Sequence, residues 1–567
     1  MFSGKNSIKE KNGVWVRIKE NNSFAKSLIF SVVAITLAMT PGLNKDSLIV
    51  PKFIILFCLA LFLLPIIFRN TSNLLTSRYY KTLAVLVLLL LLNGTLILIN
   101  STSPIEQLIF GRMGRGLGFI TFFSVLIVLT ASSIIIKREN IDFLLKGIVL
   151  AGLVNSVYVL LQFFGLDIFK WDSKTNGIIG TLGNPNSLSS FIAMIFIPAV
   201  VGFWYSKYRI PLLIVFVPIF LFNIYFSQST QGYIGLIASI IVFSLIFAWY
   251  KTKIIFFISS SITVFISVAA TFGMLGHGPL SYYLYKVSVQ SRGDFWRSAV
   301  ATGNSHPLFG VGFDSFGDFS LKFRDEIAAA HPFAEYTDSA HNFYLDYLAT
   351  GGYPYLFLNI LLTLLALGSF LTIQRRYKTF DPRIAALFCA WLVVQLQTII
   401  NTQTITFLSW NALISGALIG IAGSSNHLVE LKADPLVKSK VMTTIKLPSV
   451  FLVILGLVIS FPYFNNDRLL IKASSTGNGD LLIKATTSYP QSVTKYSQSS
   501  RALLDSGLPV PSLFLAQKGV EFNPRSTSLW ALILVNQAAS VSERQTAKEK
   551  ILELDPFNEE VKNILIQ

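Results

Sequence analysis

Charged residues are scarce in this chain of 567 residues: Asp, Glu, Lys and Arg together make up only 13% of it, against about 25% in soluble domains. Hydrophobic residues make up 53%, and the mean hydropathy is +0.60. The apolar residues form repeated runs of roughly 20, the length of a membrane-spanning helix. Because these runs are continuous and do not alternate with polar residues, they exclude a membrane β-barrel. The composition therefore predicts an all-α, polytopic helical membrane protein.

Cysteine is also rare. The only two, Cys58 and Cys389, lie in apolar runs, so no disulfide framework is expected. The chain has no GKS or GKT loop and no HExxH, CxxC or GxSxG motif, which argues against an ATPase, a zinc enzyme and a serine hydrolase. The loops expected to face outward also lack an acidic DxD pair, so a metal-bound nucleotide-sugar site is not supported. We predict neither a metal nor a cofactor.

We expect the apolar segments to form 13 membrane spans. They lie at about 24–43, 48–68, 82–100, 117–136, 144–164, 187–206, 210–226, 231–249, 253–275, 350–373, 384–402, 404–422 and 446–463. No small-residue cleavage site follows the first segment, so the sequence predicts a retained span and not a secretory signal.

Every second loop along the chain is basic. The basic segments are residues 1–23, 69–81, 137–138, 207–209, 251–253, 375–378 and 432–446. Cytoplasmic loops are enriched in Lys and Arg, which accounts for the net charge of +17 without a nucleic-acid partner. The alternation predicts a cytoplasmic N-terminus, residues 24–463 as the transmembrane domain, and an extracytoplasmic tail.

Two loops predicted to face outward contain arginine despite this bias. The arginines are Arg112, Arg115, Arg292, Arg297 and Arg324, and the last three belong to a large polar loop at 276–342. A single outer arginine is usually a headgroup contact. Five of them, with four histidines in the large loop, favour a site for an anionic, lipid-borne substrate. A guanidinium binds phosphate through two parallel hydrogen bonds, and His341 can exchange a proton near neutral pH.

Two uncharged segments are expected at the same face. Residues 180–186 carry Asn184-Pro185-Asn186, a turn in which we expect Asn186 or Ser187 to cap the next helix. Residues 227–232 include Gln231, and their hydroxyls and amides suit either contact with a sugar or phosphate, or N-capping of the following span.

The tail, residues 464–567, is polar enough to be soluble. Ala485…Pro490, Ala516…Pro524 and Ala547…Pro556 recur at a spacing of 31 to 34 residues, close to the roughly 34-residue period of tetratricopeptide repeats. The segments 511–522, 527–539 and 542–554 read as amphipathic helices. The tail is either an outward docking module for a protein partner or a small cap that stabilises the neighbouring loop.

As a set, these motifs resemble the O-antigen ligase/polymerase superfamily of polytopic bacterial glycosyltransferases with a GT-C-like fold. The resemblance covers residues 80–425, and its most specific parts are Arg292-Gly293-Asp294-Phe295-Trp296, His306-Pro307-Leu308-Phe309-Gly310-Val311-Gly312 and His341-Asn342. The family usually has Ser-Arg-Gly where this chain has Thr230-Gln231-Gly232, so one phosphate-binding charge is missing.

The resemblance implies metal-independent transfer of a glycan from a polyprenyl diphosphate to an acceptor hydroxyl, at the outer face of the bacterial inner membrane. By position, Arg292 binds the diphosphate and His341 activates the acceptor. The residues assigned to substrate binding are Arg112, Arg115, Arg297, Gln231, Asn184, Asn186 and Asn342.

Several readings stay open from the sequence. The acceptor is a lipid, a growing glycan or a protein, which makes the enzyme a ligase, a polymerase or an O-oligosaccharyltransferase. A transporter of lipid-linked glycan predicts mid-membrane charges and inverted repeats, neither of which is evident. An inactive scaffold is a further alternative, because Gln231 replaces the arginine that the family usually has at this position.

Overall fold

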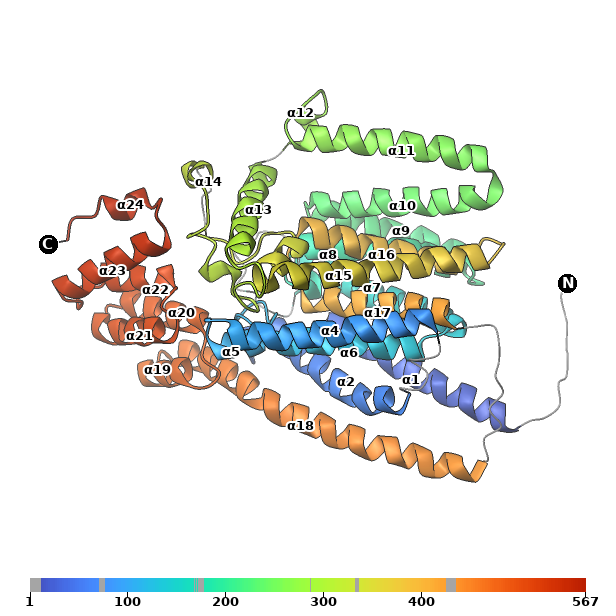
Figure 1. Ribbon diagram of the computed structural model, residues 1–567, viewed down its shortest axis with the longest axis horizontal. Coiled ribbons are helices and arrows are strands. Elements are labelled where there is room, and N and C mark those ends of the chain that lie inside the picture. The colour runs from blue at the N-terminus through green and yellow to red at the C-terminus, as the bar shows by residue number, and fades with distance from the viewer. Residues whose placement is uncertain are drawn as a thin grey trace.

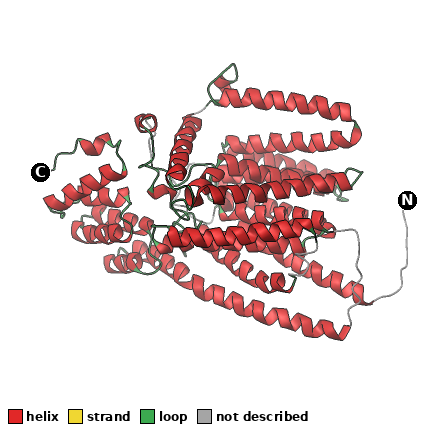
Figure 2. Ribbon diagram, in the orientation of Figure 1, coloured by secondary structure: helices red, strands yellow, loops and turns green. Residues whose placement is uncertain are grey.

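The protein is described here by a computed structural model, which covers residues 12–70, 77–167, 169, 171, 178–285, 287–331, 336–424 and 435–566. Within these residues all regular secondary structure is helical and there is no strand (Figures 1 and 2). Eleven described helices are long and apolar enough to cross a membrane, and two shorter apolar helices lie at Ser23–Leu37 and Phe119–Ile135. These helices match the 13 predicted spans one for one, which confirms the predicted fold class.

The helices that contain the spans make up most of the chain. They are α1 (Asn12–Leu37), α2 (Ile49–Arg69), α4 (Arg78–Asn100), α6 (Phe119–Ile135), α7 (Ile141–Phe163), α8 (Pro185–Trp204), α9 (Arg209–Phe226), α10 (Thr230–Lys251), α11 (Lys253–Met274), α15 (Phe343–Arg376), α16 (Pro382–Ile400), α17 (Ile405–Gly423) and α18 (Pro435–Thr476). Shorter elements connect them: α5 (Ile105–Phe110), η1 (Arg138–Asn140), η2 (Gly180–Leu182), α12 (Ser281–Leu284), α13 (Val287–Ser305), η3 (Phe316–Asp318) and α14 (Glu326–Ala330).

The centre of the bundle is α17, of whose apolar span 94% is buried. It packs tightly on α6 because two glycines bring the backbones together. A Cβ atom on Gly416 would lie 2.4 Å from the carbonyl oxygen of Leu129, and one on Gly420 would lie 2.4 Å from that of Ser133. Small residues of this kind let membrane helices approach closely. By contrast, none of the apolar span of α11 is buried, as expected for a helix surrounded by lipid.

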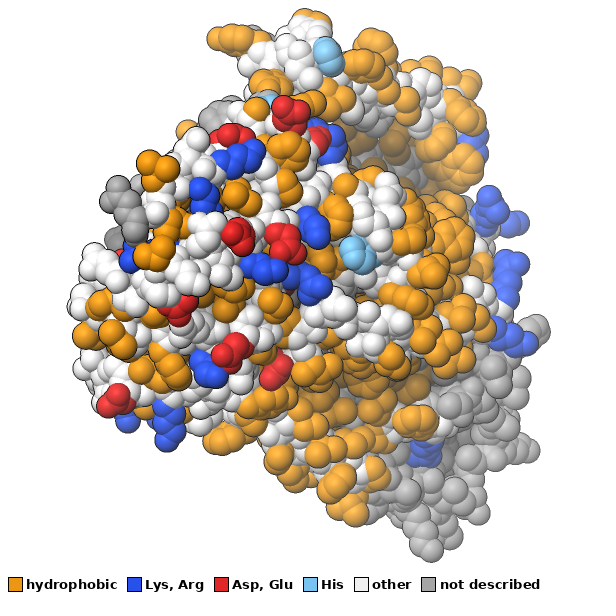
Figure 3. Space-filling view, turned by 60° about the vertical axis from the view of Figure 1, so that its left-hand side comes forward, with side chains coloured by type: hydrophobic (Ala, Val, Ile, Leu, Met, Phe, Trp, Pro, Cys, Tyr) orange, Lys and Arg blue, Asp and Glu red, His pale blue; other side chains and the backbone are white. Residues whose placement is uncertain are grey.

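The loops sort to the two ends of the bundle as the charge pattern predicts (Figure 1). At the end that carries the C-terminal helices, the Arg525 guanidinium donates to the carbonyl of Thr102. At the opposite end, two predicted basic loops meet, where Arg138 pairs with Asp381 at 3.1 Å. The predicted segments 1–23 and 432–446 lie partly outside the described residues. Charged side chains gather at the C-terminal end, whereas the flank of the bundle is mostly hydrophobic (Figure 3).

The sequence predicts a short helix around Arg292 and Arg297, and α13 confirms it. This helix lies across the bundle axes at the end that carries the C-terminal helices (Figure 1). It is therefore placed to cover the ends of the spans and not to cross the membrane.

The helix α15 reverses direction within the chain. Gly352 has φ +71° and ψ −171°, a conformation outside the helical region. The Tyr344 hydroxyl lies 3.1 Å from Thr363 Oγ1, although 19 residues of straight helix would separate them by about 28 Å. Residues 343–351 therefore fold back along the first turns of the segment after Gly352.

Alanine at position 352 is expected to destabilise the fold by about 1–3 kcal/mol or more, because its backbone conformation is almost restricted to glycine. A Cβ atom there would also lie 2.3 Å from the Pro307 carbonyl oxygen. Thermal unfolding in detergent measures the effect. Gly368→Ala, later in the same helix, is the matched control because nothing lies within 4 Å of its Cβ position. Equal melting temperatures for the two variants would contradict the reversal.

The tail begins as a continuation of the last span, since α18 runs on to Thr476. The helices that follow are α19 (Gly479–Thr487), α20 (Val493–Asp505), α21 (Pro509–Phe522), α22 (Thr527–Val535), α23 (Val541–Leu554) and α24 (Glu559–Lys562). Helices α21, α22 and α23 lie at the three positions where the sequence predicts helices, although α22 ends at Val535 and not at residue 539. The pairs α18/α19, α20/α21 and α22/α23 pack on each other, and each second helix carries one of the fully buried residues Ala485, Ala516 and Ala547.

Candidate functional site

Two of the residues singled out from the sequence meet at the end of the bundle near the C-terminal helices. On α13, Phe295 stacks on the His341 imidazole, with ring centroids 5.5 Å apart and an interplanar angle of 30°. Arg292 lies three residues before Phe295, on the same face of the helix, and its charge acts on His341. The structure therefore brings Arg292 and His341 together across 49 residues of sequence.

The backbone fixes the orientation of His341. Its φ of +53° lies in the left-handed region, which costs a non-glycine residue about 1–2 kcal/mol. The His341 N–H donates to Ser339 Oγ at 3.1 Å, and Nδ1 lies 3.2 Å from the Ser339 carbonyl oxygen. Because a carbonyl oxygen only accepts, we assign the ring hydrogen to Nδ1. Nε2 then keeps its lone pair and is free to accept a proton.

The surroundings of His341 favour the neutral imidazole. Burial lowers its pKa below the usual 6.5, and the positive charge of Arg292 lowers it further. The ring is therefore uncharged at neutral pH, the state that a general base needs. The Ser339 contact and the negative charge of Asp338 raise the pKa of the imidazole, but the net effect of its surroundings is a lowered pKa.

Arg292 differs from the other arginines of this end of the molecule. Its side chain has no ion pair or hydrogen bond within the described part of the chain, and its Nε is buried. Burial also lowers the pKa of the guanidinium. A buried charge without a partner is costly, so this group is suited to an anion that binds from outside the chain.

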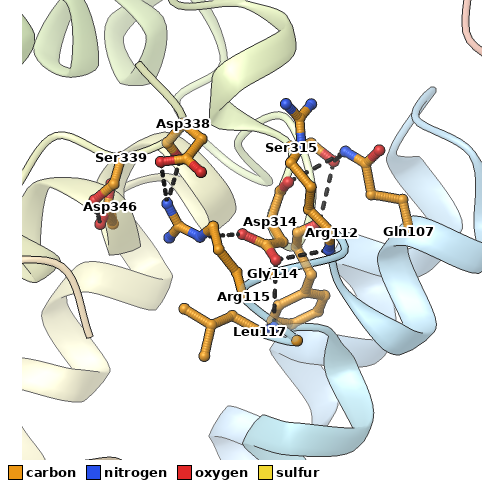
Figure 4. Close-up of polar contacts among 12 residues, drawn as sticks. Gln107, Arg112, Gly114, Arg115, Leu117, Asp314, Ser315, Asp338, Ser339 and Asp346 are labelled. Atoms are coloured by element: carbon orange, nitrogen blue, oxygen red, sulfur yellow. Dashed lines mark hydrogen bonds and ion pairs between the residues drawn. The ribbon is translucent and has the colours of Figure 1, made fainter. Parts of the chain in front are cut away.

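Carboxylates pair with each of the other outer arginines. The pairs are Arg112 with Asp318, Arg115 with Asp314 and Asp338, Arg297 with Asp294 and Asp325, and Arg324 with Asp555. Figure 4 shows Arg112 and Arg115 with Asp314 and Asp338. Arg115 Nε lies 2.8 Å from Asp314 Oδ1, and Arg115 Nη1 lies 3.0 Å from Asp338 Oδ1. Most of the positive charge expected from the sequence is therefore compensated within the protein.

The acids that pair with Arg112 and Arg115 are functional neighbours that sequence reasoning missed. Asp314 and Asp318 stand two and six residues after the HPLFGVG motif, and Asp338 stands three residues before His341. The sequence could have pointed to these acids, because they lie in the same large loop as three of the outer arginines. Burial raises the pKa of Asp314, against the lowering effect of Arg115.

Three of the predicted binding asparagines make contacts within the chain. Asn342 Oδ1 caps α15 by accepting from the Tyr344 N–H at 3.1 Å. Asn184 Oδ1 caps α8 by accepting from the Asn186 N–H at 2.8 Å. The cap of α8 is therefore Asn184, and the prediction that Asn186 or Ser187 supplies it is wrong, because Pro185 opens the helix and places the cap before itself.

Gln231 lies near the outer end of the α8, α10 and α16 packing. Ser229 caps α10, and its hydroxyl donates to Asn186 Oδ1 at 2.7 Å, which confirms the capping alternative for this segment. Gln231 is buried, and neither polar atom of its amide has a partner within the described residues. No hydrogen bond, ion pair or ring contact in the described part of the chain joins Asn184, Asn186 or Gln231 to His341 or Arg292.

The HPLFGVG segment holds the first part of α15 in place. The Val311 N–H donates to the Ala349 carbonyl at 2.8 Å, and the Gly312 N–H donates to that of Thr350 at 2.9 Å. Gly310 is required by this approach, since a Cβ atom there would lie 2.2 Å from the Thr350 carbonyl carbon. The motif therefore acts through its backbone, as the support for the helix that follows His341.

No group of three or more His, Cys, Asp or Glu residues within the described ranges has the arrangement of a metal site. Two side chains at this end of the molecule, His341 and Arg292, offer complementary chemistry. A neutral imidazole can take a proton, and an unpaired guanidinium can bind an anion. Together they can activate a hydroxyl beside a phosphate group.

The fold is that of a polytopic helical membrane protein, with an imidazole and an arginine that lacks a carboxylate partner among the described residues close together at one end. Residues 215–360 match the family model described as O-antigen ligase. The matched residues include Gln231, Arg292, the HPLFGVG segment and His341. A search of curated proteins gives no match to this chain. The family match supports a ligase-like transfer of glycan by a membrane-embedded protein.

Proposed function

We propose that the protein transfers a glycan from a polyprenyl diphosphate carrier to an acceptor hydroxyl at the outer face of the cytoplasmic membrane. The observation that carries this proposal is the meeting of Arg292, which has no carboxylate partner among the described residues, with His341, whose Nε2 is free. The first group suits an anionic leaving group, and the second suits a hydroxyl nucleophile. Neither step needs a metal or a cofactor.

In the first step the diphosphate of the donor binds at Arg292. The planar guanidinium donates two parallel hydrogen bonds to phosphate oxygens, and it stabilises the negative charge that grows there as the glycosidic bond breaks. Arg112, Arg115 and Arg297 are engaged with acids, so they contribute to the field around the donor more than to direct contact.

In the second step Nε2 of His341 takes the proton of the acceptor hydroxyl. The acceptor oxygen attacks the anomeric carbon, the bond from that carbon to the diphosphate oxygen breaks, and the configuration inverts. The polyprenyl diphosphate leaves with the electron pair of the broken bond. Asp338, close enough to raise the pKa of His341, stabilises the imidazolium that forms.

Loss of the gene in its host tests the proposal and identifies the acceptor. Accumulation of full-length lipid-linked polymer indicates a ligase, accumulation of single lipid-linked repeat units indicates a polymerase, and loss of glycan from a protein indicates an O-oligosaccharyltransferase. An unchanged glycan profile would reject glycan transfer and leave the scaffold reading. The paired helices of the tail, with buried alanines at a near 34-residue spacing, support a tetratricopeptide-like module that binds a protein or polymer partner.

The proposal requires His341 and Arg292 to face outward, and labelling of single cysteines tests this topology. In a background where Cys58 and Cys389 are serine, we expect Lys322→Cys to react with a membrane-impermeant maleimide on intact cells. Lys378→Cys, at the other end of the bundle, is expected to react only after permeabilisation. Both side chains are exposed, so burial does not explain a difference. The reverse pattern would place the site in the cytoplasm and exclude the proposed reaction.

A further inference from the structure

The turn that carries His341 is held from two sides. On one side, Asp346 accepts from the Ser339 hydroxyl at 2.6 Å and from the Ala340 N–H at 2.8 Å. On the other side, Arg115 Nη1 donates to the carbonyl oxygen of Asp338 at 2.6 Å and to its carboxylate at 3.0 Å. The turn from Asp338 to His341 is therefore fixed by α15 and by Arg115 (Figure 4).

Arg115 is itself held rigidly. Its Nε pairs with Asp314, whose other carboxylate oxygen accepts from the Arg112 N–H at 2.7 Å and from the Leu117 N–H at 3.3 Å. Asp314 and the Arg115 guanidinium are almost fully buried, with side chains 0% and 12% exposed. The loop that presents Arg115 cannot move without breaking several buried polar contacts.

The same network reaches the C-terminal helices. Asp318 pairs with Arg112 and accepts from Gln107 Nε2 at 2.9 Å and from Asn523 Nδ2 at 3.0 Å. Asn523 follows the end of α21, so the tail touches the acid that holds Arg112. The polar contacts thus run from the tail through Asp318, Arg112, Asp314 and Arg115 to the turn before His341.

We propose that Arg115 is a positioning residue for His341, which it holds in place through Asp338 without contacting either substrate. This inference rests on the proposed function, because it assigns Arg115 to the support of the base and not to the diphosphate. It departs from the sequence-based assignment of Arg115 to substrate binding. The same guanidinium nitrogen donates to the backbone carbonyl oxygen and to Oδ1 of Asp338, which gives the acid a fixed place next to the imidazole.

Three charged groups act on the imidazole from the surrounding elements. Arg292 on α13 and Arg115 in the loop before α6 lower the pKa of His341, and Asp338 in its own loop raises it. Removing the charge of Arg115 therefore raises this pKa, and it also frees Asp338 to raise it further. Removing the charge of Asp338 lowers it. The two neutral variants are thus expected to shift the titration of His341 in opposite directions.

The experiment compares Arg115→Gln, Asp338→Asn and the wild type, with Arg501→Gln as the control. Arg501 is an exposed arginine on α20, paired only with Asp505 within the described residues. Titration of His341 is read from the pH dependence of its modification by diethyl pyrocarbonate, followed by mass spectrometry, and independently from the acid limb of the rate of glycan transfer. We expect the midpoint to move to higher pH in Arg115→Gln, to lower pH in Asp338→Asn, and not at all in Arg501→Gln.

Positioning also predicts a split between kinetic constants. Displacement of a catalytic group by about 1 Å costs up to about 10²-fold in rate, so kcat should fall in Arg115→Gln while KM for the donor stays close to that of the wild type. A large rise of KM with kcat unchanged would instead assign Arg115 to the diphosphate and overturn the inference. Arg115→Lys keeps the charge in case Arg115→Gln does not fold, and should retain the wild-type midpoint with a reduced kcat.

The outcomes separate this inference from the proposed function. If the modification midpoints move as expected while the wild type transfers no glycan, the proposed function fails and the link from Arg115 to His341 stands. If the wild type transfers glycan and both variants titrate like it, the positioning role is rejected while the function stands.

Discussion

Replacement of His341 by alanine is expected to lower the rate of glycan transfer by about 10²–10⁴-fold, the usual contribution of a general base, while leaving the amount of protein in the membrane unchanged. The reason is that Nε2 of His341 is free to take the acceptor proton, since Nδ1 faces the Ser339 carbonyl. Transfer is measured with purified protein and lipid-linked donor. His277→Ala, an exposed histidine earlier in the same loop, is the matched control.

The pH dependence tests the same assignment. A base is active only when it is deprotonated, so wild-type transfer should fall as the pH drops through the pKa of His341. Because that pKa lies below the usual 6.5, the enzyme should remain fully active at neutral pH. The residual activity of the alanine variant should lack this acid limb. Wild-type rates in His341→Ala, or an acid limb that survives in it, would show that another group takes the proton.

Replacement of Arg292 by alanine is expected to cost about 10²–10³-fold in rate, or about 3–4 kcal/mol of transition-state stabilisation. Arg292 has no carboxylate partner within the described part of the chain, its Nε is buried, and its charge acts on the base. The substitution therefore removes a positive charge that pairs with no carboxylate among the described residues, so we expect it to affect substrate binding more than folding. Arg292→Lys should recover only part of the activity, because an ammonium group cannot bind phosphate in the same two-pronged way.

The control for Arg292 is Lys322→Ala, which removes an exposed positive charge from the same loop. Transfer with a donor that carries one phosphate in place of two provides a second test. If Arg292 binds the diphosphate, the penalty of Arg292→Ala should be smaller with the monophosphate donor. An equal penalty with both donors, together with a lower melting temperature, would assign Arg292 to stability.

Hydropathy and charge alternation were sufficient to predict the spans, because a helix in lipid must be long, apolar and closed in its hydrogen bonds. The helix around Arg292 and the helices of the tail were also predictable from local pattern. The meeting of Arg292 with His341 was expected only from the resemblance. The local sequence pattern gives no indication that Arg292 and His341, which are 49 residues apart, lie close together.

The pairing of the remaining arginines could not be predicted. Arg112 and Asp318 are 206 residues apart, and the partner of Arg324 is Asp555, in the last part of the chain. Such pairs depend on how loops from different spans meet. The reversal at Gly352 could not be predicted either, because the apolar segment around it has the pattern of one continuous helix. The glycine is required by the close approach of Pro307, which the sequence does not reveal.

The closeness of Arg292 to His341 has a thermodynamic consequence. When an anion occupies the guanidinium, the repulsion that disfavours the imidazolium is cancelled, so the loaded enzyme holds a stronger base than the empty one. Because linkage is reciprocal, protonation of His341 at mildly acidic pH should increase the affinity for the polyprenyl diphosphate carrier. The same protonation should lower the rate of transfer. An idle enzyme thus keeps a weak base, and reactivity rises only once there is a glycan to transfer.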